Sequence, residues 1–364
     1  MEPMKRAINL ARRAIGTTSP NPPVGAVVVS NGKTMGEGWT QPPGGYHAER
    51  VALEMAGANA QGGILYTTLE PCCIQGRTPP CTDAIIRAGI LRVNVSTIDP
   101  NPAVNGRGIL QLKAAGIQVD IGQKESQYKS LLDPYCKWIA TNLPFVTAKY
   151  AMSLDGKIAT DRGESRWISG SSSRKFTHNL RKESDAVIVG IGTATKDNPR
   201  LTVRDARDKP ATRQPLRIVI DSSGKLSPNA LLLYEPGKTL VATATISNER
   251  KSLLNDFGAE VLVIPGENKR VNLMLLLEEL GKRGISNVLL EGGGILLSSM
   301  LQQKLIDKII AFVAPVIIGG ENSPTPVEGR SVTNLIEATK LENITTKKLG
   351  EDFLIMGYPA KRSV

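Results

Sequence analysis

Hydrophobic and polar positions follow the helical period in some segments and the two-residue period of strands in others. Together they predict a regular alternation of helices and strands. In the first part of the chain, apolar residues at helical spacing predict helices over residues 4–15, 48–56, 82–88, 108–115 and 124–141. Short apolar runs rich in β-branched residues predict strands over residues 24–29, 34–39, 64–69, 92–98 and 118–121. This alternation is typical of an α/β unit whose sheet is covered on both faces, with the segment 124–141 as a lid or connector.

The second part of the chain repeats the α/β pattern without repeating the sequence. Strands are predicted over residues 145–151, 186–189, 216–220, 239–242, 260–264, 287–291, 308–318 and 352–358, and helices over residues 173–183, 249–256, 273–283 and 295–303. Pro144 separates the two parts, because it ends the preceding helix and a strand begins at Phe145. A chain of 364 residues is long for one hydrophobic core, so we predict two domains, residues 1–143 and 144–364.

Composition favours a globular cytoplasmic protein. The hydrophobic content is 41%, and the longest apolar run, residues 309–318, contains Pro315 and is too short to span a membrane. Residues 1–16 mix charged and apolar positions, as an amphipathic helix does, and do not form a signal peptide. Four cysteines fit a reducing compartment better than a disulfide framework, with Cys73 and Cys136 as ordinary thiols.

The net charge of +11 raises the question of a nucleic-acid partner. The basic residues are scattered and aromatic residues make up only 4% of the chain, so neither a basic tract nor a stacking platform is present in the sequence. Small phosphorylated molecules explain part of the excess charge. We therefore expect phosphorylated small-molecule partners and a homo-oligomer, and neither a nucleic acid nor a membrane as a partner.

Residues 47–81 carry the strongest chemical signal. His47 and Glu49 open a predicted helix, Cys72 follows a predicted strand, and Cys81 opens the next helix. One histidine and two cysteines can hold a zinc ion through three ligands and leave the fourth position to water. In the zinc deaminases the metal activates water, and a glutamate moves protons without binding the metal. The sequence predicts His47, Cys72 and Cys81 as zinc ligands and Glu49 as the catalytic proton shuttle.

Each part of this pattern also has a simpler interpretation. A His-x-Glu pair is common on helix surfaces, and two cysteines nine positions apart could be buried free thiols. The combination of the pair, a strand, Pro71-Cys72 and a cysteine at a helix start is much more specific.

Two glycine clusters in the second part could hold a nucleotide phosphate. Gly292-Gly293-Gly294 joins a strand to a helix, and bare backbone N–H groups at a helix start attract anions. Gly190 and Gly192 follow another buried strand. Neither cluster matches the Gly-x-Gly-x-x-Gly fingerprint, so each cluster taken alone is more typical of a tight turn than of a nucleotide site.

Three segments of the first part resemble the bifunctional deaminase/reductase family of riboflavin biosynthesis. They are Gly76-Arg77-Thr78-Pro79-Pro80, Ser19-Pro20-Asn21-Pro22 and Asp99-Pro100-Asn101-Pro102. The distance from Cys72 to Cys81 is also longer than the Pro-Cys-x-x-Cys spacing of nucleobase deaminases. The resemblance extends over nearly the whole chain. It implies a three-layer domain like that of the zinc cytidine deaminases, with Asn21 at the substrate.

The second part resembles the reductase domain of the same family in residues 149–157, 165–168 and 197–204. The resemblance implies an α/β fold similar to dihydrofolate reductase, with NADPH as cofactor. It places NADPH against Ala151, Trp167, Thr193, Asp197, Ser222, Gly293, Gly294, Ile295, Leu296, Leu297, Ser298 and Ser299. It places the substrate against Ser165, Arg181, Leu201, Arg204 and Glu291.

Three of the basic residues in this part can be interpreted chemically. Arg181 and Arg204 suit a sugar phosphate, because a guanidinium binds phosphate bidentately, although either could be a surface charge. Lys149 is a catalytic candidate, and its alternative is a strand-end lysine in a salt bridge.

The chain departs from the family at two positions. The family usually has one histidine two residues after the first zinc cysteine and another just before the His-x-Glu helix, where this chain has Ile74 and Thr40. Both positions would contact substrate and not metal. The predicted zinc ligands and proton shuttle are therefore retained, while pyrimidine binding differs.

These observations predict a bifunctional enzyme. The first domain would remove the exocyclic amine of a phosphoribosylated diaminopyrimidinone by zinc-dependent hydrolysis. The second would reduce the ribosyl group to ribityl with NADPH. Two alternatives stay open: a deaminase of RNA or single-stranded DNA, which would need a basic groove with stacking aromatics, and a reductase whose zinc site is purely structural, which Ile74 and Thr40 leave possible.

Overall fold

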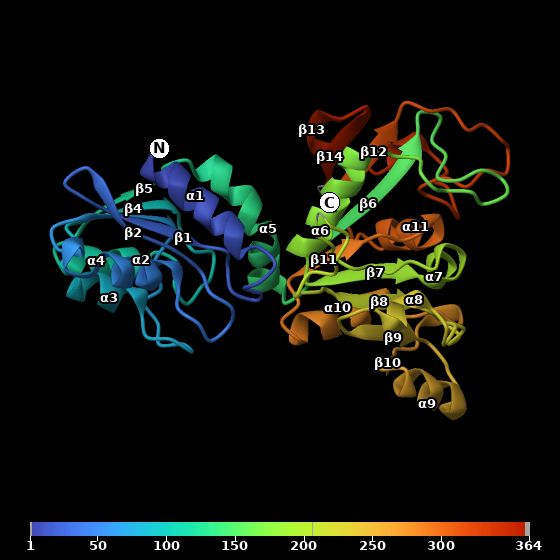
Figure 1. Cartoon of the computed structure of the whole chain (residues 1–364), viewed down its shortest axis with the longest axis horizontal. Coiled ribbons are helices and arrows are strands. Elements are labelled where there is room, and N and C mark those ends of the chain that lie inside the picture. Colours follow the sequence, from blue (N-terminus) through green and yellow to red (C-terminus); the bar gives the residue numbers. More distant parts are fainter. Residues whose placement is uncertain (1, 206, 361–364) are drawn as a thin grey trace. The chain divides into compact units, whose positions relative to one another are not determined.

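The structure is a computed structural model that describes residues 2–205 and 207–360. Contacts divide the chain into two compact units, Met1–Leu143 and Pro144–Val364, and each unit is built around one β-sheet (Figure 1). The mixed α/β class predicted from the alternating pattern is present in both units. In the described part of the chain, no helix is long and apolar enough to cross a membrane.

The first unit has three layers around a five-stranded sheet in the order β2-β1-β3-β4-β5. Strand β1 is antiparallel to β2 and β3, and the remaining pairs are parallel. Helices α1 and α5 cover one face, and α2, α3 and α4 cover the other (Figure 1). The strands are β1 Gly25–Ser30, β2 Lys33–Trp39, β3 Ile64–Leu69, β4 Arg92–Thr97 and β5 Gln118–Ile121. The helices are α1 Pro3–Ala14, α2 Ala48–Ala56, α3 Cys81–Arg87, α4 Arg107–Ala114 and α5 Glu125–Thr141, with a 3-10 turn at Gly57–Ala60.

Glycines allow two helices of this unit to approach the sheet closely. A Cβ atom at Gly25 in β1 would collide with the backbone of α1 at Ala7. A Cβ atom at Gly36 or Gly38 in β2 would collide with the backbone of α2. Because α2 begins directly after His47, these glycines also set how close that histidine lies to the sheet.

The second unit contains a nine-stranded sheet in the order β10-β9-β8-β7-β11-β6-β12-β14-β13. The strands from β10 to β12 are parallel, and β14 is antiparallel to both β12 and β13. The strands are β6 Phe145–Ser153, β7 Ala186–Gly190, β8 Leu216–Ile220, β9 Thr239–Thr243, β10 Ala259–Val263, β11 Asn287–Leu290, β12 Lys308–Ala314, β13 Leu341–Leu349 and β14 Asp352–Pro359. The helices are α6 Ser171–Glu183, α7 Ile191–Asp197, α8 Leu231–Tyr234, α9 Asn248–Asp256, α10 Leu273–Lys282 and α11 Gly294–Gln302, with 3-10 turns at Glu267–Lys269 and Leu335–Glu337.

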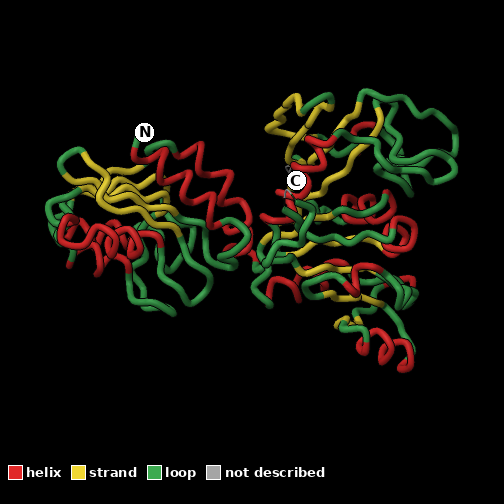
Figure 2. The backbone as a smooth tube through the Cα atoms, viewed as in Figure 1, coloured by secondary structure: helices red, strands yellow, loops and turns green. Residues whose placement is uncertain are grey.

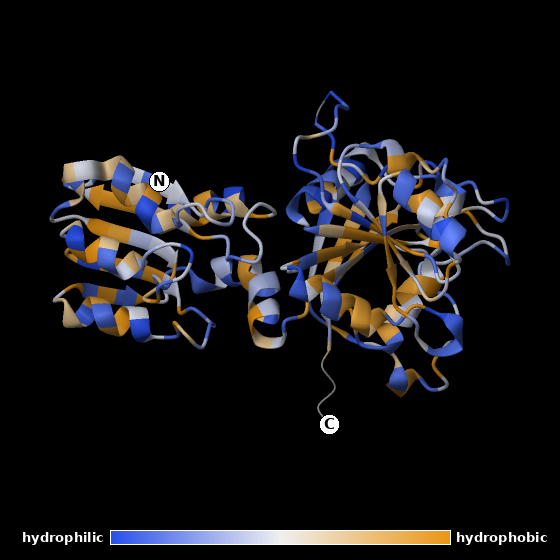
Figure 3. Ribbon diagram, turned by 90° about the horizontal axis from the view of Figure 1, so that it is seen from below, coloured by the Kyte–Doolittle hydropathy of each residue, from blue (hydrophilic) through white to orange (hydrophobic). Residues whose placement is uncertain are grey.

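Apolar strands form the centre of each unit, with helices around them (Figure 3). In the second unit the long loops after β6 and β12 are held together (Figure 2). The Asp155 carboxylate accepts hydrogen bonds from the N–H groups of Ile318 (3.1 Å) and Gly319 (2.7 Å), and the Ile158 N–H donates to the carbonyl of Pro324 (2.9 Å). These loops follow the carboxyl ends of parallel strands, which is where open α/β sheets bind ligands.

Several predicted elements were wrong or missed. The strand expected over residues 308–318 ends at Ala314, because Pro315 has no N–H to continue the ladder. Helix α5 is also part of the core of the first unit, since Tyr128 and Leu132 are buried there. Strand β13 was missed because its side chains are mostly exposed and show no alternation. Helices α7 and α8 are too short for a periodic signal.

Candidate active sites

The four residues predicted for a zinc deaminase site lie together in the first unit. The ligand atoms of His47, Cys72 and Cys81 all lie within 4.8 Å of one another. His47 Nδ1 is 3.4 Å from the Sγ atoms of both Cys72 and Cys81, and Cys81 Sγ is 3.6 Å from the Glu49 carboxylate. All four cysteines of the chain are free thiols.

Local structure explains this convergence. His47 is the N-cap of α2, and Glu49 lies in the first turn of that helix. Cys81 is the first residue of α3, and its backbone N–H donates to Cys72 Sγ (3.4 Å). Two helix N-termini therefore point their positive ends at one group of thiols and an imidazole, which favours thiolate.

The donor set fits zinc. Bonds of about 2.3 Å to sulfur and about 2.0 Å to nitrogen at tetrahedral angles separate the two ligand atoms by roughly 3.5 Å. The hydrogen bond from Cys81 is the largest of the effects that lower the pKa of Cys72, to about 4, so a thiolate is available at neutral pH. The same hydrogen bond, together with burial, raises the pKa of Cys81.

Glu49 has the environment of a proton shuttle. Its side chain is 3% exposed, and burial raises its pKa to about 7. The Thr67 hydroxyl donates to Glu49 Oε1 (3.4 Å) and to the carbonyl of Leu69 (3.0 Å), which orients the carboxylate. A carboxyl group with a pKa near 7 can both accept and release a proton at neutral pH.

His47, Glu49 and Cys72 line a cavity of about 340 Å³, large enough for a small ring compound. Asn21, predicted as a substrate ligand, lines the same cavity. So do Thr40 and Ile74, which stand where the family has histidines. The Thr40 hydroxyl accepts a hydrogen bond from the Val24 N–H (3.0 Å), whereas Ile74 presents an apolar surface.

Glu70 supports the far wall of this cavity, a role that the sequence did not suggest. Its buried carboxylate accepts hydrogen bonds from the N–H groups of Asp99 (3.2 Å), Gly106 (2.9 Å) and Ile109 (3.2 Å). Glu70 thereby ties the loop after β4 and the start of α4 to the segment that carries Cys72. Its position directly before Pro71-Cys72 was the one available signal.

In the second unit, three predicted site residues form one buried ionic cluster. Glu291 Oε1 lies 2.5 Å from Arg181 Nε, and Glu291 Oε2 lies 3.5 Å from Lys149 Nζ. Burial acts to raise the pKa of Glu291, but the charges of Arg181 and Lys149 outweigh it and lower the pKa to about 2. Burial also lowers the pKa of Lys149. Lys149 therefore has the predicted salt bridge, in a buried position that also suits a proton donor.

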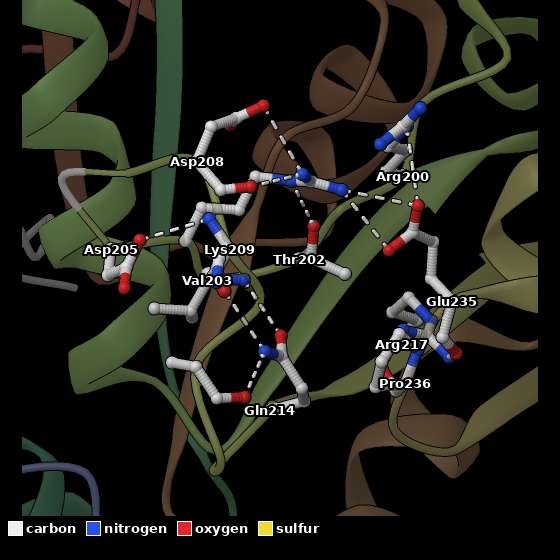
Figure 4. A network of polar contacts seen from close by, with 12 residues as sticks. Arg200, Thr202, Val203, Asp205, Asp208, Lys209, Gln214, Arg217, Glu235 and Pro236 are labelled. Atoms are coloured by element: carbon white, nitrogen blue, oxygen red, sulfur yellow. Dashed lines mark hydrogen bonds and ion pairs between the residues drawn. The ribbon is translucent and has the colours of Figure 1, made fainter.

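Arg204 belongs to a separate polar network (Figure 4). Its guanidinium donates to Thr202 Oγ1 (3.1 Å), to the carbonyl of Asp208 (2.7 Å) and to both carboxylate oxygens of Glu235 (3.2 Å each). Arg200 Nε lies 3.3 Å from the same Glu235 carboxylate. The contact with Glu235 could not be predicted from the sequence, because Glu235 lies in a loop 31 positions away.

The predicted cofactor residues lie around the carboxyl ends of the central strands. Thr193 in α7 is beside Gly293, the N-cap of α11, since a Cβ at Gly293 would lie 3.2 Å from Thr193 Oγ1. Asp197 ends α7 and lies 3.5 Å from the Ser165 hydroxyl. Trp167 is largely exposed, with the Arg174 guanidinium 4.6 Å from its ring centroid.

The remaining predicted residues are distributed around these contacts. Ala151 lies in β6, paired with Phe312 in β12. The Ser222 hydroxyl accepts from the Val271 N–H (3.3 Å). Leu201 is buried and has a positive φ of 54°. Residues 294–299 form the first turns of α11, in which Leu297 and Ser298 face inward and Ile295 is exposed, while Leu296 packs near Gly190.

Two families match the chain, one over each unit. Residues 1–97 match the cytidine and deoxycytidylate deaminase zinc-binding region, and residues 144–355 match the RibD C-terminal domain. The two matches agree with the deaminase-like and reductase-like fold classes predicted from the sequence.

Full-length relatives carry both regions. The riboflavin biosynthesis protein RibD of Aquifex aeolicus is 43% identical and covers 97% of this chain and 96% of its own length. RibD of Escherichia coli is 40% identical over 87% of this chain and 88% of its own length. The structure of Acinetobacter baumannii RibD superposes with a TM-score of 0.87 at 37% identity, covering 99% of this chain and 98% of that one. A Thermotoga maritima diaminohydroxyphosphoribosylaminopyrimidine deaminase/5-amino-6-(5-phosphoribosylamino)uracil reductase superposes with a TM-score of 0.86 at 35% identity, covering 98% of each chain.

Proposed function

The chain belongs to the RibD family of riboflavin biosynthesis proteins and is a bifunctional deaminase and reductase, and from this premise we propose how its two units divide the chemistry. The first unit hydrolyses 2,5-diamino-6-(5-phosphoribosylamino)pyrimidin-4-one, replacing an exocyclic amine by oxygen and releasing ammonia. The second unit reduces the ribosyl group of the product to ribityl with NADPH. The observation that carries this proposal is the cluster of His47, Cys72 and Cys81 beside Glu49, at a cavity lined by His47, Glu49 and Cys72.

In the first unit, His47, Cys72 and Cys81 would hold zinc, which when bound supplies a water of lowered pKa. The buried Glu49 takes a proton and delivers it to the ring and to the leaving amine. Thr67 keeps the carboxylate oriented toward the cavity. Asn21 binds the substrate. Ile74, which stands where the family has a histidine, packs against the substrate through its apolar side chain.

In the second unit, NADPH when bound supplies the hydride. Thr193 and the residues at the start of α11 would hold the cofactor, and Ser165, Leu201 and Arg204 would contact the sugar phosphate. Lys149, next to Glu291, provides the proton that reduction of the sugar carbon requires. The pairing of Lys149 and Arg181 with Glu291 keeps both cations fixed before substrate binds.

One experiment tests both halves. Purified protein is incubated with the phosphorylated diaminopyrimidinone, with and without NADPH, and the masses of the products are measured by mass spectrometry. We expect replacement of one amine by oxygen without NADPH, and the further gain of two hydrogens with it. Reduction without deamination would mean that the zinc site is structural. Homo-oligomeric assembly and a cytoplasmic location remain predictions from the sequence.

A further inference from the structure

We propose that Arg200 is a further substrate-binding residue of the reductase unit, which binds the phosphate group of the sugar-phosphate substrate and so makes the reductase selective for phosphorylated substrates. The inference rests on the proposed reductase function and deepens it. Four observations carry it: the free donors of Arg200, the occupied donors of Arg204, the local charge, and the position of Arg200 in the chain.

Arg200 has donors to offer. Its side chain is 52% exposed, and its Nε lies 3.3 Å from Glu235 Oε1. Among the residues that the structure describes, no acceptor contacts the two Nη atoms of Arg200. The guanidinium is thus held at one edge by a carboxylate, as the close view shows, while its Nη edge remains available for a phosphate (Figure 4).

Arg204, by contrast, has already used its donors. Its Nε donates to Thr202, its Nη1 to the carbonyl of Asp208, and its Nη2 to both oxygens of Glu235. Asp208 also places a carboxylate oxygen 3.4 Å from Nη1. Arg204 can contribute positive charge to an anion site, but an approaching phosphate needs N–H donors from elsewhere, and Arg200 is the nearest guanidinium bound to the same carboxylate.

Two guanidinium groups share the Glu235 carboxylate. Arg200 and Arg204 both contact this carboxylate, whose side chain is 14% exposed. The other carboxylate, Asp208, is 84% exposed, so water screens it. Two guanidinium groups held on one carboxylate, one of them half exposed, suit a dianionic group such as a phosphate monoester.

Buried Arg217 anchors the loop that carries Glu235, whose carboxylate contacts both Arg200 and Arg204. Its guanidinium donates to the backbone carbonyl oxygens of Glu235 (3.0 Å), Pro236 (2.6 Å) and Gly237 (2.8 Å). The loop that carries Glu235 is therefore anchored to β8. Because a side chain held in place loses less entropy on binding, Glu235 makes Arg200 a better ligand than a free surface arginine.

The position of Arg200 favours the substrate over the cofactor as the source of the phosphate. Arg200 directly precedes Leu201, a predicted substrate contact, and it shares the Glu235 carboxylate with Arg204, another predicted substrate contact. NADPH also carries a phosphate monoester, at its ribose. The test must therefore separate these two phosphates.

The test uses the full-length protein, with NADPH oxidation measured against phosphorylated and dephosphorylated ribosylaminouracil. For Arg200→Gln we expect the KM for the phosphorylated substrate to rise by roughly tenfold, because a charge-assisted hydrogen bond is lost. The kcat, the KM for NADPH and the KM for the dephosphorylated substrate should stay within about twofold. Arg200→Lys, which keeps the charge, should recover part of the loss. Added salt should raise the KM less in Arg200→Gln than in the wild type.

Arg283→Gln is the matched control, because Arg283 is a partly exposed arginine of the same unit that pairs with Glu260 and Glu279 away from this network. It should leave every KM unchanged. Three results for Arg200→Gln would overturn the assignment. They are an equal rise of the KM for the phosphorylated and the dephosphorylated substrate, a loss of NADPH affinity instead, and an unchanged KM for the phosphorylated substrate. A wild-type protein that oxidises no NADPH with either substrate would instead refute the proposed function itself. A thermal unfolding midpoint equal to that of the wild type shows that Arg200→Gln is folded.

Discussion

The two candidate sites of this protein are assembled in opposite ways. The deaminase site takes all of its proposed metal ligands and its proton shuttle from residues 47–81, at the ends of consecutive elements. The reductase site draws Lys149, Arg181 and Glu291 from elements whose paired residues, Lys149 and Glu291, lie as many as 142 positions apart. One site is a short sequence motif folded onto itself, and the other exists only once the nine-stranded sheet has formed.

This difference predicts how each site fails. In the proposed function a metal ion would hold the first site together, so its chemistry would depend on a few ligands, while the sheet beneath it has its own core. Buried charges hold the second site together, so loss of one partner costs both activity and folding free energy. Substitutions can therefore separate the two activities.

The largest effect is expected from removing a metal ligand. Cys81→Ser should lower the zinc content from about one ion per chain to none and abolish deamination, because two ligands do not retain the ion. Reduction of pre-deaminated substrate should persist. Metal analysis and product masses measure both outcomes, and Cys136→Ser, which alters a thiol in α5, is the control. Zinc retained in Cys81→Ser would show that another residue binds the metal.

Removing the proton shuttle should leave the metal in place. Glu49→Gln keeps the shape of the side chain, so zinc should stay bound while the deamination rate falls by at least ~10²-fold. Glu54→Gln changes an exposed glutamate of the same helix, which pairs with Arg50, and should be neutral. Rates of ammonia release compare the two variants. Near-normal deamination in Glu49→Gln would contradict the assigned role.

In the reductase site, a substitution that removes one charge should lower both stability and activity. Glu291→Gln leaves Arg181 and Lys149 buried without a counter-charge, and breaking such a buried pair costs about 3–5 kcal/mol. Hydrogen exchange of peptides from β6 and β11 measures this loss in the second unit. Glu260→Gln, which breaks a surface pair with Arg283, should cost under ~1 kcal/mol. Equal costs in the two variants would show that the cluster is not a stabilising unit.

The smallest effect is a dependence of stability on pH. The pKa of Glu291 is about 2 in the folded protein and 4.5 in its ordinary state, so its ionised form stabilises the fold above pH 4.5. As the pH falls from 4.5 through 2, about 3 kcal/mol of this stabilisation should be lost. Unfolding free energies at pH 6 and pH 3, compared between wild type and Glu291→Gln, isolate this contribution. A wild type and variant that lose stability in parallel would contradict it.

Much of the fold could be predicted because its elements have strong periodic patterns. The bounds of α2 and β3 were predicted to the residue, since glycines and a proline limit them. Strand β13 could not be predicted, because an edge strand exposed on both faces has no apolar alternation. The end of β12 was misjudged because the apolar run continues beyond Pro315.

The sequence by itself determined the zinc motif, its glutamate and the two-part α/β organisation, because these depend on residues close together in the chain and on periodic burial. Only the tertiary structure decided which charges are paired. Glu235 contacts Arg204 at a distance of 31 positions, and Glu291 contacts Arg181 at 110. Such partners are chosen by strand order and loop placement, which no local pattern encodes. For that reason the occupied donors of Arg204 and the free edge of Arg200 became visible only in three dimensions.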